Sequence, residues 1–366
     1  MNVCERFLLV LALACFAGVQ AFALKVDSTP PESPQDKQGK IGEAFTAIEN
    51  AIKDEIKDID ANPEKLIQGF ADASTFSALG ATQRAYGEYK LWAFTVGPMV
   101  GIRLPGSSFF NVADEIQDIG NTLEEDGDIR AGLNIQGITG QFGLNTSKFL
   151  LDKLYLGVRF GYFNLTAIEN LDFETFHIGL TGNYQLLKGI NVVSGLFRWR
   201  GVNAGTGLIF QRTTLGYTYQ LERQQADIAV DGGSYGSING SIYVDPAINF
   251  DMDVNTFIIP LEVNTSAQLL WILNLNLGLG VDVAFGENTT TLSMSSDVNG
   301  DEALGITKPG YLSINAGGSM GPTVFNPKLM ANLGFKFGPV IIDVPVTCYF
   351  VGGPGLSAGV TLGAVW

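Results

Sequence analysis

His177 is the residue best suited to acid–base chemistry, because it is the only histidine among the 366 residues. A hydrolase built on a Ser/His or Asp/His pair would need it as the general base. The sequence places His177 on the polar face of an alternating segment, with Thr175, Gly179 and Thr181. Serine and asparagine are abundant on every such face, so a neighbour of the right type would occur by chance. The pattern therefore favours a histidine that lines a polar interior in a protein that is not an enzyme. A hydrolase centred on His177 is the alternative.

Metal and cofactor chemistry finds little support in the sequence. Of the three cysteines, Cys4 and Cys15 fall in an N-terminal leader, which leaves Cys348 as the only thiol of the mature chain. One histidine and one cysteine do not make a ligand cluster of the usual spacing. The acidic run 297–301 lacks the rest of a calcium-loop pattern. We expect no catalytic residue, no metal ligand and no cofactor.

Charges within otherwise apolar alternating segments are more informative. Where Phe197 and Trp199 face lipid, Arg198 and Arg200 must face inward, because a charge on the lipid face of a barrel costs about 2–4 kcal/mol near the midplane. Inward cations could form an anion-attracting constriction or pair with inward acids, and pairing is favoured because buried charge is normally paired. The candidate lumen-facing residues are Arg159, His177, Arg198, Arg200, Arg212, Asp282 and Asp343.

The composition narrows the class of protein. The chain is 46% hydrophobic and 16% charged, with 45 glycines and 24 phenylalanines, so it is more apolar than an ordinary soluble domain. Its net charge is −15 and its pI about 4.5, and no basic stripe interrupts the acidic balance. We therefore expect no nucleic-acid partner.

The N-terminus predicts export. Residues 1–23 combine a short start that ends at Arg6, an apolar run and a small-x-small end, which is the pattern of a signal peptide. Acylation of Cys15 as a lipoprotein is the competing interpretation. Residues 24–40 are rich in proline, serine and charge, and we expect a flexible linker there.

A helical period follows the linker. Apolar residues recur at intervals of three and four, a stripe that predicts one amphipathic helix. The stripe consists of Ile41, Phe45, Ile48, Ile52, Ile56 and Ile59. Asn62-Pro63 ends this helix, and a weaker helical or irregular stretch is expected over 64–79. Residues 41–85 could plug a lumen, dock beneath a barrel or form a periplasmic segment.

From residue 86 to the end the period is two. The segments are about ten residues or longer, as a tilted bilayer span requires, and their second face is Gly, Asn, Thr and Ser. Fourteen segments can be drawn, and twelve are also compatible with the pattern. The fourteen lie near 88–103, 129–143, 152–164, 172–186, 190–201, 205–221, 240–250, 254–270, 272–286, 288–296, 311–319, 327–337, 340–350 and 356–366. Tight turns are expected at 187–189 and 337–339, and long loops at 104–128, 222–240 and 297–310. The predicted fold is all-β: an antiparallel transmembrane β-barrel of about 12–14 strands over 86–366, preceded by a short N-terminal helical segment.

The leader, the alternating strands and the closing segment 356–366 resemble bacterial outer-membrane β-barrel proteins as a class. In that class a last strand that ends on an aromatic residue is the signal read by the barrel-assembly machinery, which implies this role here for Val360, Leu362 and Trp366. The helical segment closed by Asn62-Pro63 looks a little like the hatch of long-chain fatty-acid transporters, although Glu64 stands where those proteins have alanine. The resemblance implies an outer-membrane location in a Gram-negative-type bacterium, with membrane lipid, the assembly machinery and periplasmic chaperones as partners.

Two functions of a barrel are favoured on the sequence alone, and a soluble secreted β-protein is a further alternative because a soluble sandwich also alternates. The first is a passive, porin-like channel or a transporter of a small solute, including a hydrophobic one. The second is a structural or surface-exposed barrel, such as an adhesin, that acts through its long loops. An open lumen would favour the first, and a packed lumen the second.

Overall fold

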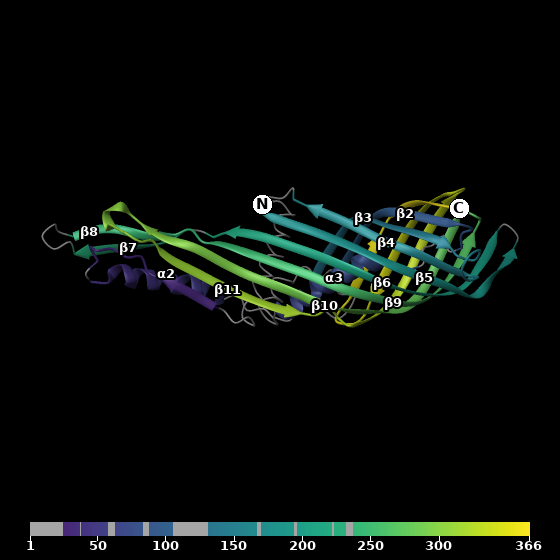
Figure 1. Cartoon of the computed structure of the whole chain (residues 1–366), viewed down its shortest axis with the longest axis horizontal. Helices are drawn as coiled ribbons and strands as arrows, with labels where there is room; N and C mark the ends of the chain where they lie inside the picture. Colours follow the sequence, from purple (N-terminus) through teal and green to yellow (C-terminus); the bar gives the residue numbers. More distant parts are fainter. Residues whose placement is uncertain are drawn as a thin grey trace.

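A computed structural model describes residues 25–366 with gaps at 37, 58–62, 83–87, 105–130, 167–169, 194–195, 222 and 232–236. The molecule is elongated, with a barrel at one end and a sheet-built lobe at the other (Figure 1). The predicted signal peptide and most of the predicted loop at 104–128 lie outside the described residues.

Two helices precede the barrel. Helix α2 spans Lys40–Lys57 and begins where the carboxylate of Asp36 accepts hydrogen bonds from the backbone N–H groups of Lys40 and Ile41, both 2.8 Å long. Helix α3 spans Pro63–Leu79, so proline occupies the first helical turn, where its missing N–H costs nothing. It stops before Gly80, whose φ of 50° is left-handed.

All fifteen strands of the described residues belong to one antiparallel sheet. A single-turn helix, η3, spans Glu302–Leu304. The strands are β1 Lys25–Thr29, β2 Trp92–Arg103, β3 Gly132–Asn145, β4 Leu154–Leu165, β5 Leu171–Val193, β6 Phe197–Gln220, β7 Gln224–Asp231, β8 Ser237–Val244, β9 Ala247–Leu269, β10 Leu273–Gly300, β11 Gly310–Met320, β12 Phe325–Phe337, β13 Val340–Tyr349, β14 Gly355–Gly359 and β15 Thr361–Val365.

The sheet closes into a ring. Strand pairing runs β2–β3–β4–β5–β6–β9–β10–β12–β13, and β14 with β15 joins β13 back to β2. β14 and β15 share one position and are separated at Val360. The prediction of an antiparallel barrel preceded by a helical segment is confirmed. Within the described residues the ring has ten positions, counted from these pairings, rather than the predicted 12–14.

The difference in number comes from strand length and from one strand outside the ring. The segment predicted at 240–250 is divided between β8 and the start of β9, which also holds the segment at 254–270. The segments at 272–286 and 288–296 are both part of β10. No turn forms at 187–189, because β5 continues to Val193 through two register shifts, so the segment predicted at 190–201 belongs to β5 and β6. β11 lies outside the ring. The turn predicted at 337–339 is present, between β12 and β13.

The lobe is formed where the longest strands leave the ring. β9 and β10 continue beyond it and are joined there by β11, β1, β8 and β7. Its concave face holds an apolar core into which α2 buries the first four residues of the predicted stripe, Ile41, Phe45, Ile48 and Ile52. The prediction of a mobile linker over 24–40 is wrong for Lys25–Thr29, which pair with β11, since backbone hydrogen bonding replaces the missing apolar contacts.

One face of β9 changes polarity along its length while the backbone alternation continues unbroken. Within the lobe its inward residues are apolar, such as Phe250 and Met252, and its outward neighbours polar, such as Asp251. Within the ring the inward residues are polar, such as Glu262, and the outward ones apolar, such as Leu261. The lobe is therefore built for water outside and an apolar interior, and the ring for the reverse.

The inversion occurs at the same level on neighbouring strands and is marked by aromatic residues. Phe257 on β9 is paired in register with Phe210 on β6 and Phe285 on β10, and its ring centroid lies 5.0 Å and 5.8 Å from theirs. From Phe257 to Leu269, β9 covers about 40 Å at about 3.3 Å per residue. A tilt of about 40° reduces this to about 30 Å, the thickness of a hydrocarbon core.

Candidate functional site: a lumen filled by helix α3

Helix α3 lies inside the ring, where it contacts β2, β3, β6, β9, β10 and β14 (Figure 1). Every residue from Phe70 to Leu79 is buried. Backbone approaches backbone on one side: a side chain at Gly101 would overlap the carbonyl of Ala73, and one at Gly69 would overlap Ala131. The helix is therefore packed against the inner wall and is not suspended in an open pore.

An ion pair between α3 and the wall fixes the first half of the helix. Asp72 on α3 and Arg103 on β2 form an ion pair of 2.6 Å, and both side chains are fully buried. The carboxylate of Asp72 also accepts two hydrogen bonds of 2.8 Å from Thr323, one from its backbone N–H and one from its hydroxyl. Arg103 donates to the carbonyl of Gly353 at 2.6 Å and lies over the ring of Phe76. The polar groups of this pair are thus satisfied from several strands. We call the ion pair of Asp72 and Arg103 the lock.

The C-terminal end of α3 is held by Arg159 on β4. Its guanidinium donates to the carbonyl oxygens of Leu79 and Ala81, and to the side-chain oxygen of Gln141 at 3.2 Å. A cation at this position satisfies carbonyl groups that the last helical turn leaves unpaired and complements the negative end of the helix dipole. Arg159 therefore anchors helix α3, which we call the plug, to the barrel wall.

A second buried charge cluster lies beyond the helix. Lys328 on β12 forms ion pairs with Glu262 at 2.5 Å and with Asp282 at 2.7 Å, and all three side chains are fully buried. Glu262 accepts hydrogen bonds from Thr82, from its backbone N–H at 2.8 Å and from its hydroxyl at 2.5 Å. Thr82 follows α3, so this cluster also ties the N-terminal segment to the wall.

Uncharged polar groups complete the contact. Asn134 on β3 donates to the hydroxyl of Ser74 at 2.9 Å and accepts from that of Ser77 at 2.8 Å. Thr213 on β6 accepts from Asn134 at 2.9 Å. A network that joins a helix to two distant strands restricts the helix to one position.

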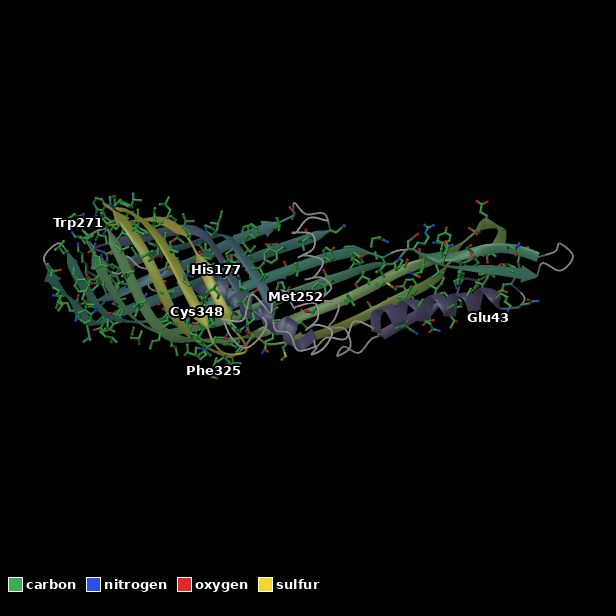
Figure 2. The ribbon with its side chains drawn as sticks, turned by 180° about the vertical axis from the view of Figure 1, so that it is seen from behind. Glu43, His177, Met252, Trp271, Phe325 and Cys348 are labelled. Carbon is green, nitrogen blue, oxygen red and sulfur yellow. The ribbon has the colours of Figure 1, made fainter. Side chains whose placement is uncertain are left out.

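The structure distributes the predicted lumen residues among three environments. Arg159, His177, Asp282 and Asp343 are buried inside the ring, and Figure 2 labels His177 in the barrel. Arg200 is buried and Arg198 half-exposed at the end of the ring where the turns are short, and Arg198 pairs with Glu88 at 2.7 Å. Arg212 does not face the lumen: it lies outward beyond the aromatic row and pairs with Asp253 at 2.7 Å. The polarity inversion explains this position, because charge is tolerated outside the apolar band.

Sequence reasoning missed the residues that hold the plug, chiefly Asp72, Arg103, Glu262 and Lys328. A signal for two of them was present. Glu262 lies between Leu261 and Val263, so the argument that turned Arg198 inward also turns Glu262 inward. The same holds for Lys328 beside Leu329. Their meeting across the lumen depends on the register of β9, β10 and β12, which one sequence does not reveal.

No helix among the described residues has the length and apolarity needed to cross a membrane. Over the same residues, no three histidine, cysteine, aspartate or glutamate side chains are grouped as a metal site would require.

The model of the Lsa36-like family matches residues 35–366, which include both helices and the whole ring. The chain belongs to the Lsa36-like family. No curated protein has a matching sequence.

Solved structures resemble this Lsa36-like chain at low identity. The translocator domain of autotransporter NalP from Neisseria meningitidis is 11% identical, with 88% of this chain and 97% of that chain covered and a TM-score of 0.29. The Pseudomonas putida toluene transporter TodX is 9% identical, with 82% and 98% covered and a TM-score of 0.27. LpxR from Salmonella typhimurium is 8% identical, with 74% and 100% covered and a TM-score of 0.23.

The outer face of the lobe is the second distinctive surface of the Lsa36-like chain. Exposed carboxylates project from neighbouring strands, and the nearby cations Arg212 and Arg223 are each paired with an acid. The side-chain hydrogen bond from Arg223 lowers the pKa of Asp245 below its ordinary value of 3.8. The face remains negative in sum. Its exposed acids include Asp172, Glu174, Asp227, Asp251, Glu287 and Asp297.

Proposed function

We propose that this protein spans the outer membrane as a barrel closed by its own helix and presents the lobe to a macromolecular partner at the cell surface. The observation that carries the proposal is the buried ion pair of Asp72 and Arg103, which fixes α3 across the lumen. This corresponds to the structural or surface-interaction alternative of the sequence, with the lobe in the role expected of long loops.

The apolar band supports a membrane-spanning ring. Outward residues on the ring strands are large and exposed, for example Leu180 at 65%, Leu279 at 65% and Leu277 at 58%. An exposed apolar surface that continues around a ring fits contact with lipid, whereas monomeric soluble proteins rarely expose such patches.

The asymmetry of the ring supports the orientation. Outer-membrane barrels have short turns on the periplasmic side and longer structures outside. Short connections join β9 to β10 and β12 to β13 at the end that carries Trp271 and Trp366, and the lobe lies at the opposite end (Figures 1 and 2). Strand β1 and helix α2 belong to the lobe, so the chain passes through the lumen between α2 and β2.

The packed lumen argues against the passive channel that was our first expectation. A conducting pore needs a continuous aqueous path, but α3 occupies the lumen and is held by two buried charge clusters. Release of α3 would leave Asp72 or Arg103 as an uncompensated buried charge, at a cost of about 3–5 kcal/mol.

The chemistry of the lobe suggests the type of partner. Its outer face carries more exposed acids than unpaired cations, and the chain as a whole has a net charge of −15. Complementary charge accelerates association and selects among partners. We expect a protein partner with a basic surface and an association that weakens as the salt concentration rises.

The exposed residues of the last strand support an interaction with a partner during biogenesis. Val360, Leu362 and Trp366 are 52%, 56% and 61% exposed and project outward around β15. This exposure would let the barrel-assembly machinery read them before β15 pairs with β2.

Reconstitution into planar bilayers tests the closed lumen. We expect no conductance steps from the wild-type protein. The single variant Asp72→Ala should open steps, because it breaks the bond between α3 and the wall and leaves Arg103 as a buried charge without its partner. A matched single variant of the lobe, Asp245→Ala, should stay silent. Regular steps from the wild type would contradict the proposal and favour a channel.

A further inference from the structure

A cavity lies at the short-turn end of the ring, opposite the lobe. Its volume is about 960 Å³, and it is lined by turn residues, by strand ends and by the segment that leads into β2. Trp366 and Tyr155 form part of its wall. It is separate from the ion pair of Asp72 and Arg103 and from the lobe, so binding at this cavity does not rest on the proposed function, whereas the compartment that the cavity faces does.

Cations dominate this cavity. Five basic side chains line it, Lys90, Lys148, Arg198, Arg200 and Lys336. Glu88 is the only acidic side chain in the lining, and it is already engaged: it accepts hydrogen bonds from Arg198 at 2.7 Å and from Gln185 at 2.6 Å. No ion pair joins Lys90, Lys148 or Lys336 to a carboxylate of the described residues.

This concentration of positive charge opposes the rest of the molecule. The chain carries 37 acidic and 22 basic residues, so a cavity with five cations and one acid is not a sample of the average surface. Gathering like charges in a concave site costs energy, and a bound anion would recover it. A concave surface of one sign also focuses its field and raises the local concentration of counter-ions.

We propose that this cavity is a binding site for a phosphate-bearing anion. Two guanidinium groups and three ammonium groups suit a phosphate, whose several oxygens accept hydrogen bonds from more than one cation at a time. The aromatic ring of Tyr155 offers contact to an attached organic group. In the orientation proposed above, the site opens to the periplasm, where the phosphate could belong to a soluble ester or to a lipid headgroup.

Calorimetry on the folded protein in a zwitterionic detergent tests the site. Inorganic phosphate should bind saturably and more tightly than acetate, which has one carboxylate. The variant Lys90→Gln/Lys336→Gln should lose at least about tenfold in affinity for phosphate, since charge-assisted hydrogen bonds are the stronger kind. Lys188→Gln is the control, because Lys188 is exposed near the same end but does not line the cavity.

Two further arms distinguish the sources and the folding of the variants. Nanodiscs that contain phosphatidylglycerol should compete with phosphate if the ligand is a headgroup, and nanodiscs of phosphatidylcholine alone should not. If neither kind of nanodisc changes the binding of phosphate, the ligand is a soluble one. Heat-modifiable migration on a gel shows that each variant is folded. The proposal is overturned if phosphate does not bind saturably, if acetate binds equally well, or if Lys90→Gln/Lys336→Gln binds as the wild type does.

Discussion

Asp72 on helix α3 and Arg103 on strand β2 lie 2.6 Å apart inside the ring, and neither side chain is exposed. This pair joins the only described helix within the lumen to the barrel wall. Because the same carboxylate also binds Thr323, the lock couples α3 to the connection between β11 and β12. Specific bonds, and not the volume of the helix alone, therefore hold α3 in the lumen.

The first prediction concerns this lock. Asp72→Ala should destabilise the folded protein by about 3–5 kcal/mol, because it leaves Arg103 as a buried charge without its partner. The double variant Asp72→Ala/Arg103→Ala should cost less than the sum of the two single variants. Urea unfolding in detergent, monitored by heat-modifiable migration on a gel, measures the free energy of unfolding of each variant. Equal costs for the double variant and the summed single variants would show that the pair is not coupled.

The second prediction concerns the polarity inversion along β9. Leu261→Arg should impair folding into membranes by about 2–4 kcal/mol, because it places a charge on the lipid face. Asp251→Arg, on the same strand and the same outward face but within the lobe, should fold normally. Assembly into lipid vesicles gives the comparison. If both variants assembled equally well, the ring would not be the part that contacts lipid.

Sequence reasoning reached the fold class for a physical reason that also limited it. Period-two alternation survives the whole length of β9 and β10, so the antiparallel barrel was predictable. The predicted breaks near 251–253 and at 287 fall near the points where polarity inverts, because a change in which face is apolar resembles the end of one strand and the start of another. The break at 187–189 was wrong because Gly189 lies against the backbone of Trp199 and Arg200 within a sheet and not in a turn.

The plug was only partly accessible to the same reasoning. The isoleucine stripe predicted α2, yet this helix packs under the lobe. The less amphipathic α3 fills the lumen, because a helix surrounded by a polar wall needs Asp72, Ser74 and Ser77 as much as apolar residues. A stripe-based search favours the wrong helix in such a case.

The third prediction concerns α2. Phe45→Ala should destabilise the lobe by about 3–5 kcal/mol, since Phe45 is buried in the lobe core. Glu43→Ala, on the exposed side of the same helix, should have little effect (Figure 2). Limited proteolysis should cut the lobe of Phe45→Ala faster while the ring stays protected. Equal protection in both variants would mean that α2 does not support the lobe.

The fourth prediction concerns the pH response of the lobe surface. Arg223→Gln should raise the pKa of Asp245 toward its ordinary value of 3.8, because the guanidinium hydrogen bond that lowers it is lost. A carboxyl group whose pKa is lowered in the folded state stabilises that state at a pH above its ordinary pKa. This stabilisation is lost as the pH falls through the pKa of the folded state. Carboxyl titration by NMR measures the shift. An unchanged titration would show that the pair does not persist in solution.

Cysteine labelling in intact cells tests the central claim most directly. In a Cys348→Ser background, Thr291→Cys places a thiol on the outward face of the lobe, and Asp152→Cys places one at the short-turn end. A membrane-impermeant maleimide should label Thr291→Cys in intact cells and label Asp152→Cys only after the outer membrane is opened. Labelling of Asp152→Cys in intact cells, with protection of Thr291→Cys, would contradict a surface lobe carried by a closed outer-membrane barrel.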